Sequence, residues 1–184
     1  MKRKRIMIVL TFMLMALSIV SSCKKSSEVD PNTPPSNPVE GVFVGNIAID
    51  FTETDSNGNP FTLESFRGKV ILLTFSAMWC GPCRREAPEL MNLYNTYKER
   101  GLEIAQCIYQ DEDGDAADLS DLARWITEFG ITFTVFNDPD RSTVDTYRFD
   151  AIPFNVLIDR NFIIRYRAAG YYPETLRHQI EQLL

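Results

Sequence analysis

The sequence contains two cysteines separated by two residues, in the stretch Trp79-Cys80-Gly81-Pro82-Cys83. This spacing lets both sulfur atoms reach disulfide distance across the first turn of a helix. A cysteine at a helix N-terminus lies at the positive end of the helix dipole, close to free backbone N–H groups, which favour thiolate over thiol. Pro82 suits an early helical position, whose N–H has no partner to lose. The motif predicts a redox-active pair, with Cys80 as the exposed nucleophile and Cys83, one turn further in, as the residue that resolves a mixed disulfide.

Other interpretations of these and similar residues are weaker. A Cys-X-X-Cys pair can be half of a zinc site, but that requires a second pair, and Cys107 and His178 are single residues far away in sequence. A purely structural disulfide is also compatible with the spacing, although a short loop at a strand–helix junction is typical of reactive ones. The acidic run 111–115 resembles a calcium loop, but its glycine is out of register and Leu122 occupies the twelfth position. We therefore expect no metal and no cofactor, a buried and inert Cys107, and a solvent-facing His178.

Hydrophobic periodicity predicts the elements that position the pair. A near-continuous apolar run at 70–77 predicts a strand covered on both faces, and apolar residues at helical spacing predict a helix up to residue 97. Asn57-Gly58 predicts a type I′ hairpin between strands at 47–52 and 61–63. The remaining predicted strands are 102–109, 133–136, 154–158 and 162–168, and the remaining helices 119–129, 142–147 and 176–184. This order predicts an α/β domain with a mixed central sheet flanked by helices on both faces.

The cysteine motif at a strand–helix junction resembles the thioredoxin superfamily. More narrowly, residues 80–88 (CGPCRREAP) are similar to the TlpA/ResA-like extracytoplasmic thiol–disulfide oxidoreductases, as are the upstream stretches 45–51 and 63–69. The similarity extends from residue 42 to the C-terminus. It implies a thioredoxin-like fold with an N-terminal β-hairpin extension, a periplasmic setting and a reducing role.

Glu86 is a candidate proton carrier. It lies three residues after Cys83 and four before Leu90, on the helix face that turns toward the core. A carboxylate there would be partly desolvated, with a raised pKa, and suited to exchange a proton with Cys83; an ordinary surface glutamate paired with Arg85 is the alternative. The family resemblance favours the proton role. Many thioredoxins carry an acidic residue six positions before the first cysteine, but Thr74 occupies that position here, so Glu86 is the only expected carrier of this kind.

Ile152-Pro153 resembles the cis-proline that faces the cysteine pair in the superfamily. A cis X–Pro bond exposes the backbone groups of the preceding residue, so that a substrate chain can pair there as an extra strand. The family often has Gly two residues before this proline and a small polar residue after it, whereas this chain has Ala151 and Phe154. Phe154 either makes the substrate groove more apolar or belongs to the core. Trp79, Ile152 and Pro153 are the predicted substrate-binding residues.

Residues 1–22 predict a lipoprotein signal peptide. A basic start at 2–5 precedes an apolar run at 6–20, which is short for a bilayer-spanning helix but suits a signal-peptide core. The stretch Val-Ser-Ser-Cys that ends at Cys23 resembles the bacterial lipobox, whose cysteine is lipidated. An uncleaved N-terminal anchor with an incidental cysteine is the alternative. Either interpretation places the rest of the chain outside the cytoplasm, as a membrane-anchored protein of the cell envelope, with the periplasmic side expected.

The segment 23–40 is rich in Pro, Ser and Asn, cannot build a core, and predicts a lipid-anchored tether. At ~3.1 Å per residue it could hold the thioredoxin-like domain, residues 41–184, roughly 50 Å from the membrane. The chain carries a net charge of −6, and removal of the signal peptide takes away four basic residues and no acidic one, which leaves −10. This balance argues against nucleic-acid binding, and membrane attachment would have to be covalent.

The leading functional prediction is reduction of disulfides in secreted or membrane proteins, which requires a thiol-reducing electron donor in the membrane. Apocytochrome haem-binding cysteines are the best-known substrate of the family. A peroxiredoxin-like thiol peroxidase shares the N-terminal pattern but needs Thr or Ser three residues before its cysteine, where Ala77 stands. A copper-carrier module with the same fold would need a histidine near the pair, and His178 is the only histidine.

Overall fold

A seven-stranded mixed sheet forms the centre of the fold, in the strand order β4-β3-β7-β6-β5-β8-β9. The computed structural model describes residues 37–184, so the predicted signal peptide, Cys23 and most of the predicted tether lie outside the described residues. The strands are β1 (Glu40–Gly41), β2 (Ile47–Ala48), β3 (Thr52–Asp55), β4 (Pro60–Thr62), β5 (Val70–Ala77), β6 (Leu102–Gln110), β7 (Thr134–Asn137), β8 (Phe154–Ile158) and β9 (Ile164–Ala169). The predicted strands from 70 onward are confirmed, with small shifts at their ends.

The central strand β5 is buried along its whole length. It pairs in parallel with β6 on one side and antiparallel with β8 on the other. Because helices cover both faces of such a strand, its side chains are apolar on both faces, which explains the unbroken apolar run. Its two polar residues, Thr74 and Ser76, are buried as well. The chain therefore leaves the middle of the sheet immediately before the cysteine pair.

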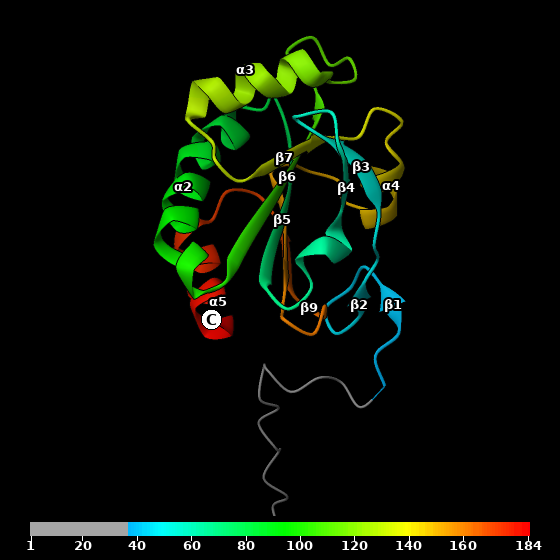
Figure 1. Ribbon diagram of the computed structural model, residues 1–184, viewed down its shortest axis with the longest axis vertical. Helices are drawn as coiled ribbons and strands as arrows, with labels where there is room; N and C mark the ends of the chain where they lie inside the picture. The colour runs from blue at the N-terminus through cyan, green and yellow to red at the C-terminus, as the bar shows by residue number, and fades with distance from the viewer. Residues whose placement is uncertain (1–36) are drawn as a thin grey trace, which may run out of the picture. The chain divides into compact units, whose positions relative to one another are not determined.

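The helices are α2 (Gly81–Tyr97), α3 (Leu119–Phe129), α4 (Ser142–Tyr147) and α5 (Pro173–Leu183), with short 3₁₀ helices η1 (Leu63–Phe66) and η2 (Lys98–Arg100). Figure 1 shows α2 and α5 together on one face of the sheet and α4 on the other. The helices α2 and α3 are in contact, and an ion pair between Arg84 of α2 and Glu128 of α3 connects them. The predicted thioredoxin-like arrangement is confirmed. Within residues 37–184, no helix has the length and apolarity that a membrane crossing requires.

The predicted hairpin is present, but its turn is of a different type. The strands β3 and β4 pair antiparallel. The strand β3 also pairs antiparallel with β7, which connects the hairpin to the rest of the sheet. A type I′ turn needs positive φ at two successive residues, whereas Gly58 has a φ of 79° and Asn57 is not in the positive region. The carboxylate of Asp55 instead accepts the backbone N–H groups of Asn57 and Asn59 at 2.9 and 2.8 Å. This side-chain contact stabilises a longer loop than the two-residue turn.

The prediction of one continuous strand at 47–52 is wrong. The strand β2 pairs in parallel with β1 in a separate two-stranded sheet, and β3 begins only after an interruption. In the interruption, the Tyr147 hydroxyl donates to the carbonyl of Ile49 at 2.8 Å, and the N–H of Glu64 donates to the carboxylate of Asp50 at 2.8 Å. These contacts with residues distant in sequence interrupt the strand.

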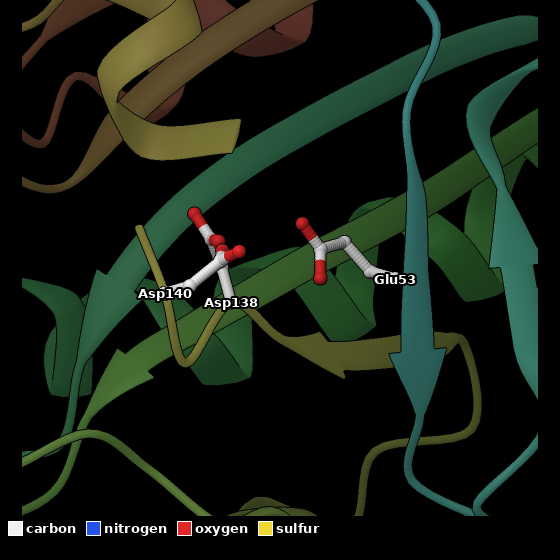
Figure 2. A group of neighbouring side chains, drawn as sticks. All are labelled: Glu53, Asp138 and Asp140. Atoms are coloured by element: carbon white, nitrogen blue, oxygen red, sulfur yellow. The ribbon is translucent and has the colours of Figure 1, made fainter. Parts of the chain in front are cut away.

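Three carboxyl groups, of Glu53, Asp138 and Asp140, gather before α4 (Figure 2). One oxygen of each lies within 4.8 Å of the others, the only such group of potential metal ligands within residues 37–184. Asp138 and Asp140 accept backbone N–H groups of the first turn of α4 at 2.7 and 3.0 Å, and Glu53 accepts the Thr143 hydroxyl. Burial, together with repulsion from the two aspartates, raises the pKa of Glu53 to about 7. Asp138 and Asp140 thus stabilise the start of α4, and Glu53 holds the side chain of Thr143.

Candidate active site

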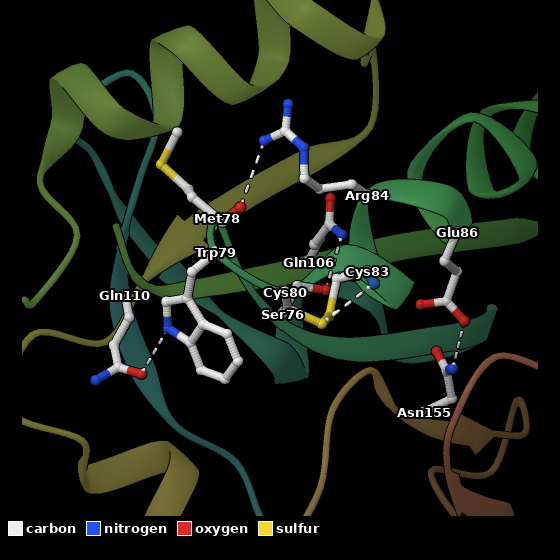
Figure 3. Close-up of a disulfide and its surroundings, with 10 residues drawn as sticks. All are labelled: Ser76, Met78, Trp79, Cys80, Cys83, Arg84, Glu86, Gln106, Gln110 and Asn155. Carbon is white, nitrogen blue, oxygen red and sulfur yellow. Dashed lines mark hydrogen bonds between the residues drawn. A yellow bond between two sulfur atoms is a disulfide. The ribbon is translucent and has the colours of Figure 1, made fainter. Parts of the chain in front are cut away.

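Cys80 and Cys83 form a disulfide at the start of α2, with their Cα atoms 5.3 Å apart (Figure 3). Cys80 is the N-cap residue of this helix, and its Sγ accepts the backbone N–H of Cys83 at 3.2 Å. Pro82 stands in the first turn, as predicted. A sulfur atom that accepts a helical N–H, at the positive end of the helix dipole, is better stabilised as a thiolate. The local geometry therefore favours ionisation at Cys80.

The prediction that Cys80 is exposed is wrong for this oxidised form. The exposed fraction of Cys80 is 2% and that of Cys83 is 0%, because both sulfur atoms are held in the disulfide between α2 and the sheet. The neighbouring Trp79 is half exposed, and its Nε1 donates to Oε1 of Gln110 at 3.2 Å. Access to Cys80 is therefore through the groove that it lines.

A groove of about 510 Å³ opens over the disulfide. Its lining residues are Trp79, Cys80, Gly81, Pro82, Tyr109, Arg141, Phe149, Asp150, Ala151 and Ile152. Trp79 and Ile152 were predicted to lie at the site, whereas Tyr109, Arg141 and Phe149 were not. The guanidinium group of Arg141 lies 5.1 Å from the ring centre of Tyr109. Of these three residues, Tyr109 alone had a signal in the sequence: it ends a predicted central strand, and the carboxyl ends of such strands are where functional groups gather.

The Ile152–Pro153 peptide bond is cis, as predicted. Ile152 lines the groove, whereas Pro153 is buried and its carbonyl accepts the backbone N–H of Gly170 at 2.7 Å. Of the two alternatives for Phe154, the structure supports the core: its ring stacks on that of Phe149, with centroids 4.8 Å apart, and it is buried.

Glu86 faces the core, as predicted, with an exposed fraction of 2%. Its Oε1 accepts Nδ2 of Asn155 on β8 at 2.8 Å (Figure 3). Burial raises the pKa of Glu86 to about 7, although the contacts with Asn155 and Thr74 oppose this rise. The alternative of a surface glutamate is excluded. Asn155 was missed by the sequence analysis, and the only signal was one amide side chain within the apolar strand 154–158.

The positive charge of Arg84 is directed away from the disulfide. Its guanidinium group pairs with Glu128, donates to the carbonyl of Met78 at 3.4 Å, and lies 5.7 Å from the ring centre of Trp125. Arg84 therefore joins α2 to α3, and the backbone N–H of Cys83 is the group that donates to Sγ of Cys80.

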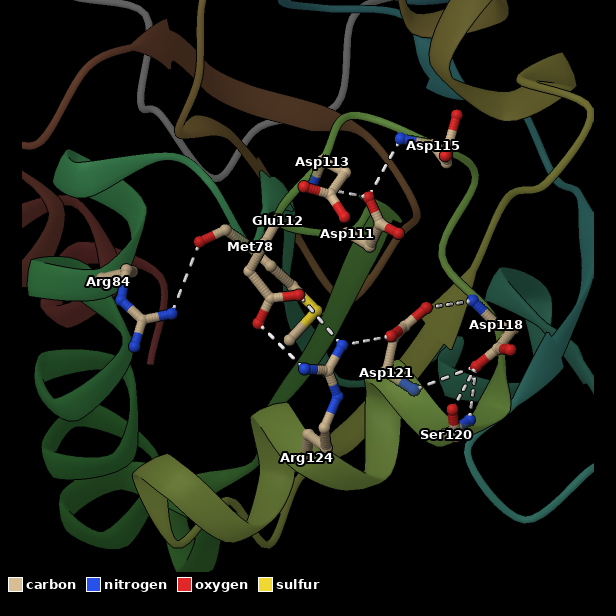
Figure 4. A network of polar contacts seen from close by, with 10 residues as sticks. All are labelled: Met78, Arg84, Asp111, Glu112, Asp113, Asp115, Asp118, Ser120, Asp121 and Arg124. Atoms are coloured by element: carbon tan, nitrogen blue, oxygen red, sulfur yellow. Dashed lines mark hydrogen bonds and ion pairs between the residues drawn. The ribbon is translucent and has the colours of Figure 1, made fainter.

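The acidic run 111–115 forms a loop (Figure 4), and its residues 112–114 line a shallow hollow together with Trp79. One carboxylate oxygen of Asp111 accepts the backbone N–H groups of Asp113 and Asp115, both at 2.9 Å. Arg124 of α3 links Glu112 to Asp121 through ion pairs. The carboxylates that are paired in this way stabilise the loop and the start of α3.

The other two single residues lie where they were predicted. Cys107 is a free thiol buried in β6, and burial raises its pKa well above the ordinary value. A thiol of this kind is unreactive at neutral pH. His178 is exposed on α5.

The fold and this site define a thioredoxin-like protein: a dithiol pair at a helix N-terminus follows a central strand, near a cis-proline. The chain matches the model of the AhpC/TSA family over residues 44–167 and belongs to that family. It is 30% identical over 145 residues to the thiol-disulfide oxidoreductase ResA of Bacillus thuringiensis (strain Al Hakam), covering 79% of each chain. It is also 35% identical over 120 residues to ResA of Geobacillus kaustophilus, covering 65% of this chain and 66% of the relative.

The structural comparisons agree. A Chlorobium tepidum protein named as a thiol:disulfide interchange protein DsbE aligns with a TM-score of 0.69 and 28% identity, over 78% of this chain and all of the other. A Bacteroides thetaiotaomicron protein named as a protein disulfide isomerase aligns with a TM-score of 0.68 and 31% identity, over 78% and 91% of the two chains. The resemblance to TlpA/ResA-like proteins is confirmed, and the chain is a protein thiol–disulfide oxidoreductase.

Proposed function

We propose that this oxidoreductase is a membrane-anchored reductant of disulfides outside the cytoplasm. The observation that carries the disulfide chemistry of this proposal is the Cys80–Cys83 disulfide at the N-terminus of α2, where a backbone N–H donates to the sulfur that lines the groove. In the reduced form, the same contact would favour the Cys80 thiolate as the nucleophile.

The proposed reaction exchanges one disulfide for another. The Cys80 thiolate attacks a substrate disulfide, a mixed disulfide forms, and the first substrate thiolate leaves and takes up a proton. The Cys83 thiol then loses its proton, and the resulting thiolate attacks Sγ of Cys80 and displaces the second substrate thiolate, which takes up a proton. Two electrons pass from the dithiol to the substrate, and the enzyme ends with the Cys80–Cys83 disulfide. A thiol-reducing donor in the membrane must return two electrons before the next cycle.

We assign the proton transfer to Glu86. As a carboxylate it accepts the proton of Cys83, which precedes it by one helical turn, and it returns this proton when the substrate thiolate leaves. A pKa of about 7 suits both directions, because the group then exists in both forms at neutral pH.

We assign substrate binding to the groove. Trp79 and Ile152 flank Cys80 along its lining, and Pro153 supports Ile152 from the buried side. A substrate chain that lies along Ile152 would pair with its backbone and present a disulfide to Cys80. Disulfides of secreted or membrane proteins, including the haem-binding cysteines of apocytochromes, are the proposed substrates.

Two alternatives have less support. Peroxidase chemistry needs a hydroxyl group against the reactive sulfur, but the residue three positions before Cys80 is the buried Ala77. A copper carrier would need further ligands beside the two sulfur atoms, and His178 is exposed on α5. A peroxide assay by stopped flow and a copper titration of the reduced protein distinguish these functions from disulfide reduction.

The reduction potential of the Cys80–Cys83 couple tests the direction of the reaction. We expect a value well below about −200 mV, the range of reductants, because a donor-fed enzyme must hold its electrons at lower potential than its substrates. The measurement is equilibration of the full-length protein in dithiol–disulfide buffers, with Cys107→Ser as a control that the buried thiol takes no part. A value near about −120 mV would instead define an oxidant.

The lipid anchor at Cys23 is a separate proposal that rests on the N-terminal sequence. Cys23→Ser should release the protein from membranes and change its gel mobility, because the acylated residue is lost. Ser22→Ala, which keeps a small residue before the cysteine, is the matched control and should leave both unchanged. Retention of the Cys23→Ser protein in the membrane fraction, with unaltered mobility, would contradict the proposal.

A further inference from the structure

Three polar side chains meet in the core close to the disulfide, each from a different element. Glu86 comes from α2, Thr74 from β5 and Asn155 from β8. Thr74 and Asn155 are directly opposite each other in the antiparallel pairing of β5 with β8. All three are buried, in strands and a helix face that are mostly apolar. The sheet register therefore places an amide and a hydroxyl group side by side under one carboxyl group.

We propose that Asn155 is a positioning residue for Glu86: its amide holds one carboxylate oxygen and leaves the other free to exchange a proton with the Cys83 thiol. The contact is the 2.8 Å hydrogen bond from Nδ2 of Asn155 to Oε1 of Glu86. In Figure 3, Oε2 is the carboxyl oxygen on the side of the disulfide. This inference rests on the proposed proton role of Glu86.

Three atoms of the group are left without a hydrogen-bond partner in the described part of the chain, and the carboxyl oxygen on the side of the disulfide is one of them (Figure 3). Oε2 of Glu86, Oγ1 of Thr74 and Oδ1 of Asn155 are buried and have no hydrogen-bond partner among the described residues. Each unpaired buried polar atom costs stability, and apolar side chains of similar size would avoid that cost. What distinguishes Oε2 of Glu86 is its position, one helical turn after Cys83 and on the side of the disulfide (Figure 3), where an unpaired carboxyl oxygen can exchange a proton.

Burial and Asn155 shift the pKa of Glu86 in opposite directions. Burial favours the neutral acid at Glu86, while the amide donor of Asn155 favours the carboxylate. The Thr74 hydroxyl acts in the same direction as Asn155, although it makes no hydrogen bond of normal geometry. Loss of the amide donor should therefore leave Glu86 protonated up to a higher pH.

Other ionisable groups around Glu86 are few. The Cys83 thiol precedes it on α2, and Tyr166 faces it from β9, with a pKa that the carboxylate of Glu86 helps to raise. On α5, Arg177 is paired with Glu89 of α2. Among the described residues, no charged neighbour contributes to the pKa shift of Glu86. Asn155 is thus the largest favourable influence on its carboxylate.

The test follows the reduction of an aromatic disulfide, 5,5′-dithiobis(2-nitrobenzoate), by the reduced full-length protein. The second thiolate released reports attack by Cys83, and its rate is measured between about pH 5 and pH 10. Asn155→Ala should move the inflection of the rate upward by roughly one pH unit, since a hydrogen bond to the charged form is lost. Asn155→Asp, of the same size, should move it further because it adds a like charge, and Thr74→Val should move it less.

The decisive comparison is between the effect of Asn155→Ala in the wild-type protein and its effect in the Glu86→Gln protein. In a Glu86→Gln background, Asn155→Ala should cause no further change in the pH profile, because the group it positions is absent. Asn137→Ala is the matched control: Asn137 is a buried asparagine on β7 that donates to the carbonyl of Ala117. It should lower the melting temperature and leave the inflection in place.

The possible outcomes separate the two claims. If Glu86→Gln changes the profile and neither Asn155 variant does, the positioning role is wrong and the proton role of Glu86 stands. If Asn155→Ala shifts the profile equally with and without Glu86, its effect is structural and the inference is overturned. If Glu86→Gln leaves the profile unaltered, the proton role and this inference fail together.

Discussion

Replacement of Cys83 by serine should stop the reaction at a covalent complex between Cys80 and the substrate. Cys80 keeps its place at the start of α2 and still attacks a disulfide, but no second thiol remains to release the product. Cys107 cannot take its place, because it is buried in β6 as an unreactive thiol. Turnover should fall to background while adducts accumulate. Non-reducing gels of cells that express the full-length Cys83→Ser protein measure this, since the adducts disappear when a reductant is added.

The control for trapping is the double variant Cys80→Ser, Cys83→Ser, which should give no adduct at all. Serine is nearly isosteric with cysteine, so neither variant should disturb the packing at the start of α2. Adducts that persist without Cys80 would show that another thiol is the nucleophile. Absence of any adduct through Cys80, or turnover by Cys83→Ser at the wild-type rate, would contradict the proposed cycle.

Glu86→Gln should remove the pH inflection of the step carried out by Cys83. In the wild-type protein Glu86 is protonated below its pKa of about 7 and cannot accept a proton, so the rate should rise as the pH passes through that value. The glutamine variant lacks the acceptor at every pH, and its rate above neutral pH should be about 100-fold lower. The release of the second thiolate from the aromatic disulfide measures both effects. Glu89→Gln, on the same helix, is the control and should keep the inflection.

The stability of the protein offers an independent measurement on the same residue. Because burial raises the pKa of Glu86 from 4.5 to about 7, the folded form retains a proton that the unfolded chain has released between these values. This contribution to stability is fully present below pH 4.5 and is lost as the pH rises through about 7. Glu86→Gln should therefore be more stable than the wild-type protein at about pH 9, by as much as about 3 kcal/mol. Equal dependence of unfolding on pH in both proteins would contradict the buried, uncharged state.

Several features could be predicted from sequence because local physical constraints dictate them. The apolar run of β5 requires burial on both faces, and the Cys-X-X-Cys pair with Pro82 suits a helix start. The core-facing position of Glu86 follows from helical periodicity alone. The hairpin was also predictable, but its turn was not, because the Asp55 side chain, rather than the Asn57-Gly58 pair, organises the loop.

Local patterns in the chain were thus enough to predict the fold class, the Cys80–Cys83 pair and the side of the helix on which Glu86 lies. The contact between Asn155 and Glu86 could not be predicted in this way, because the two residues are 69 positions apart and meet through the pairing of β8 with β5. The groove has the same origin, since Tyr109, Arg141 and Ile152 come from three separate segments. Periodicity reports which face of an element is buried, whereas the partners on that face depend on strand order and register, which no local pattern encodes.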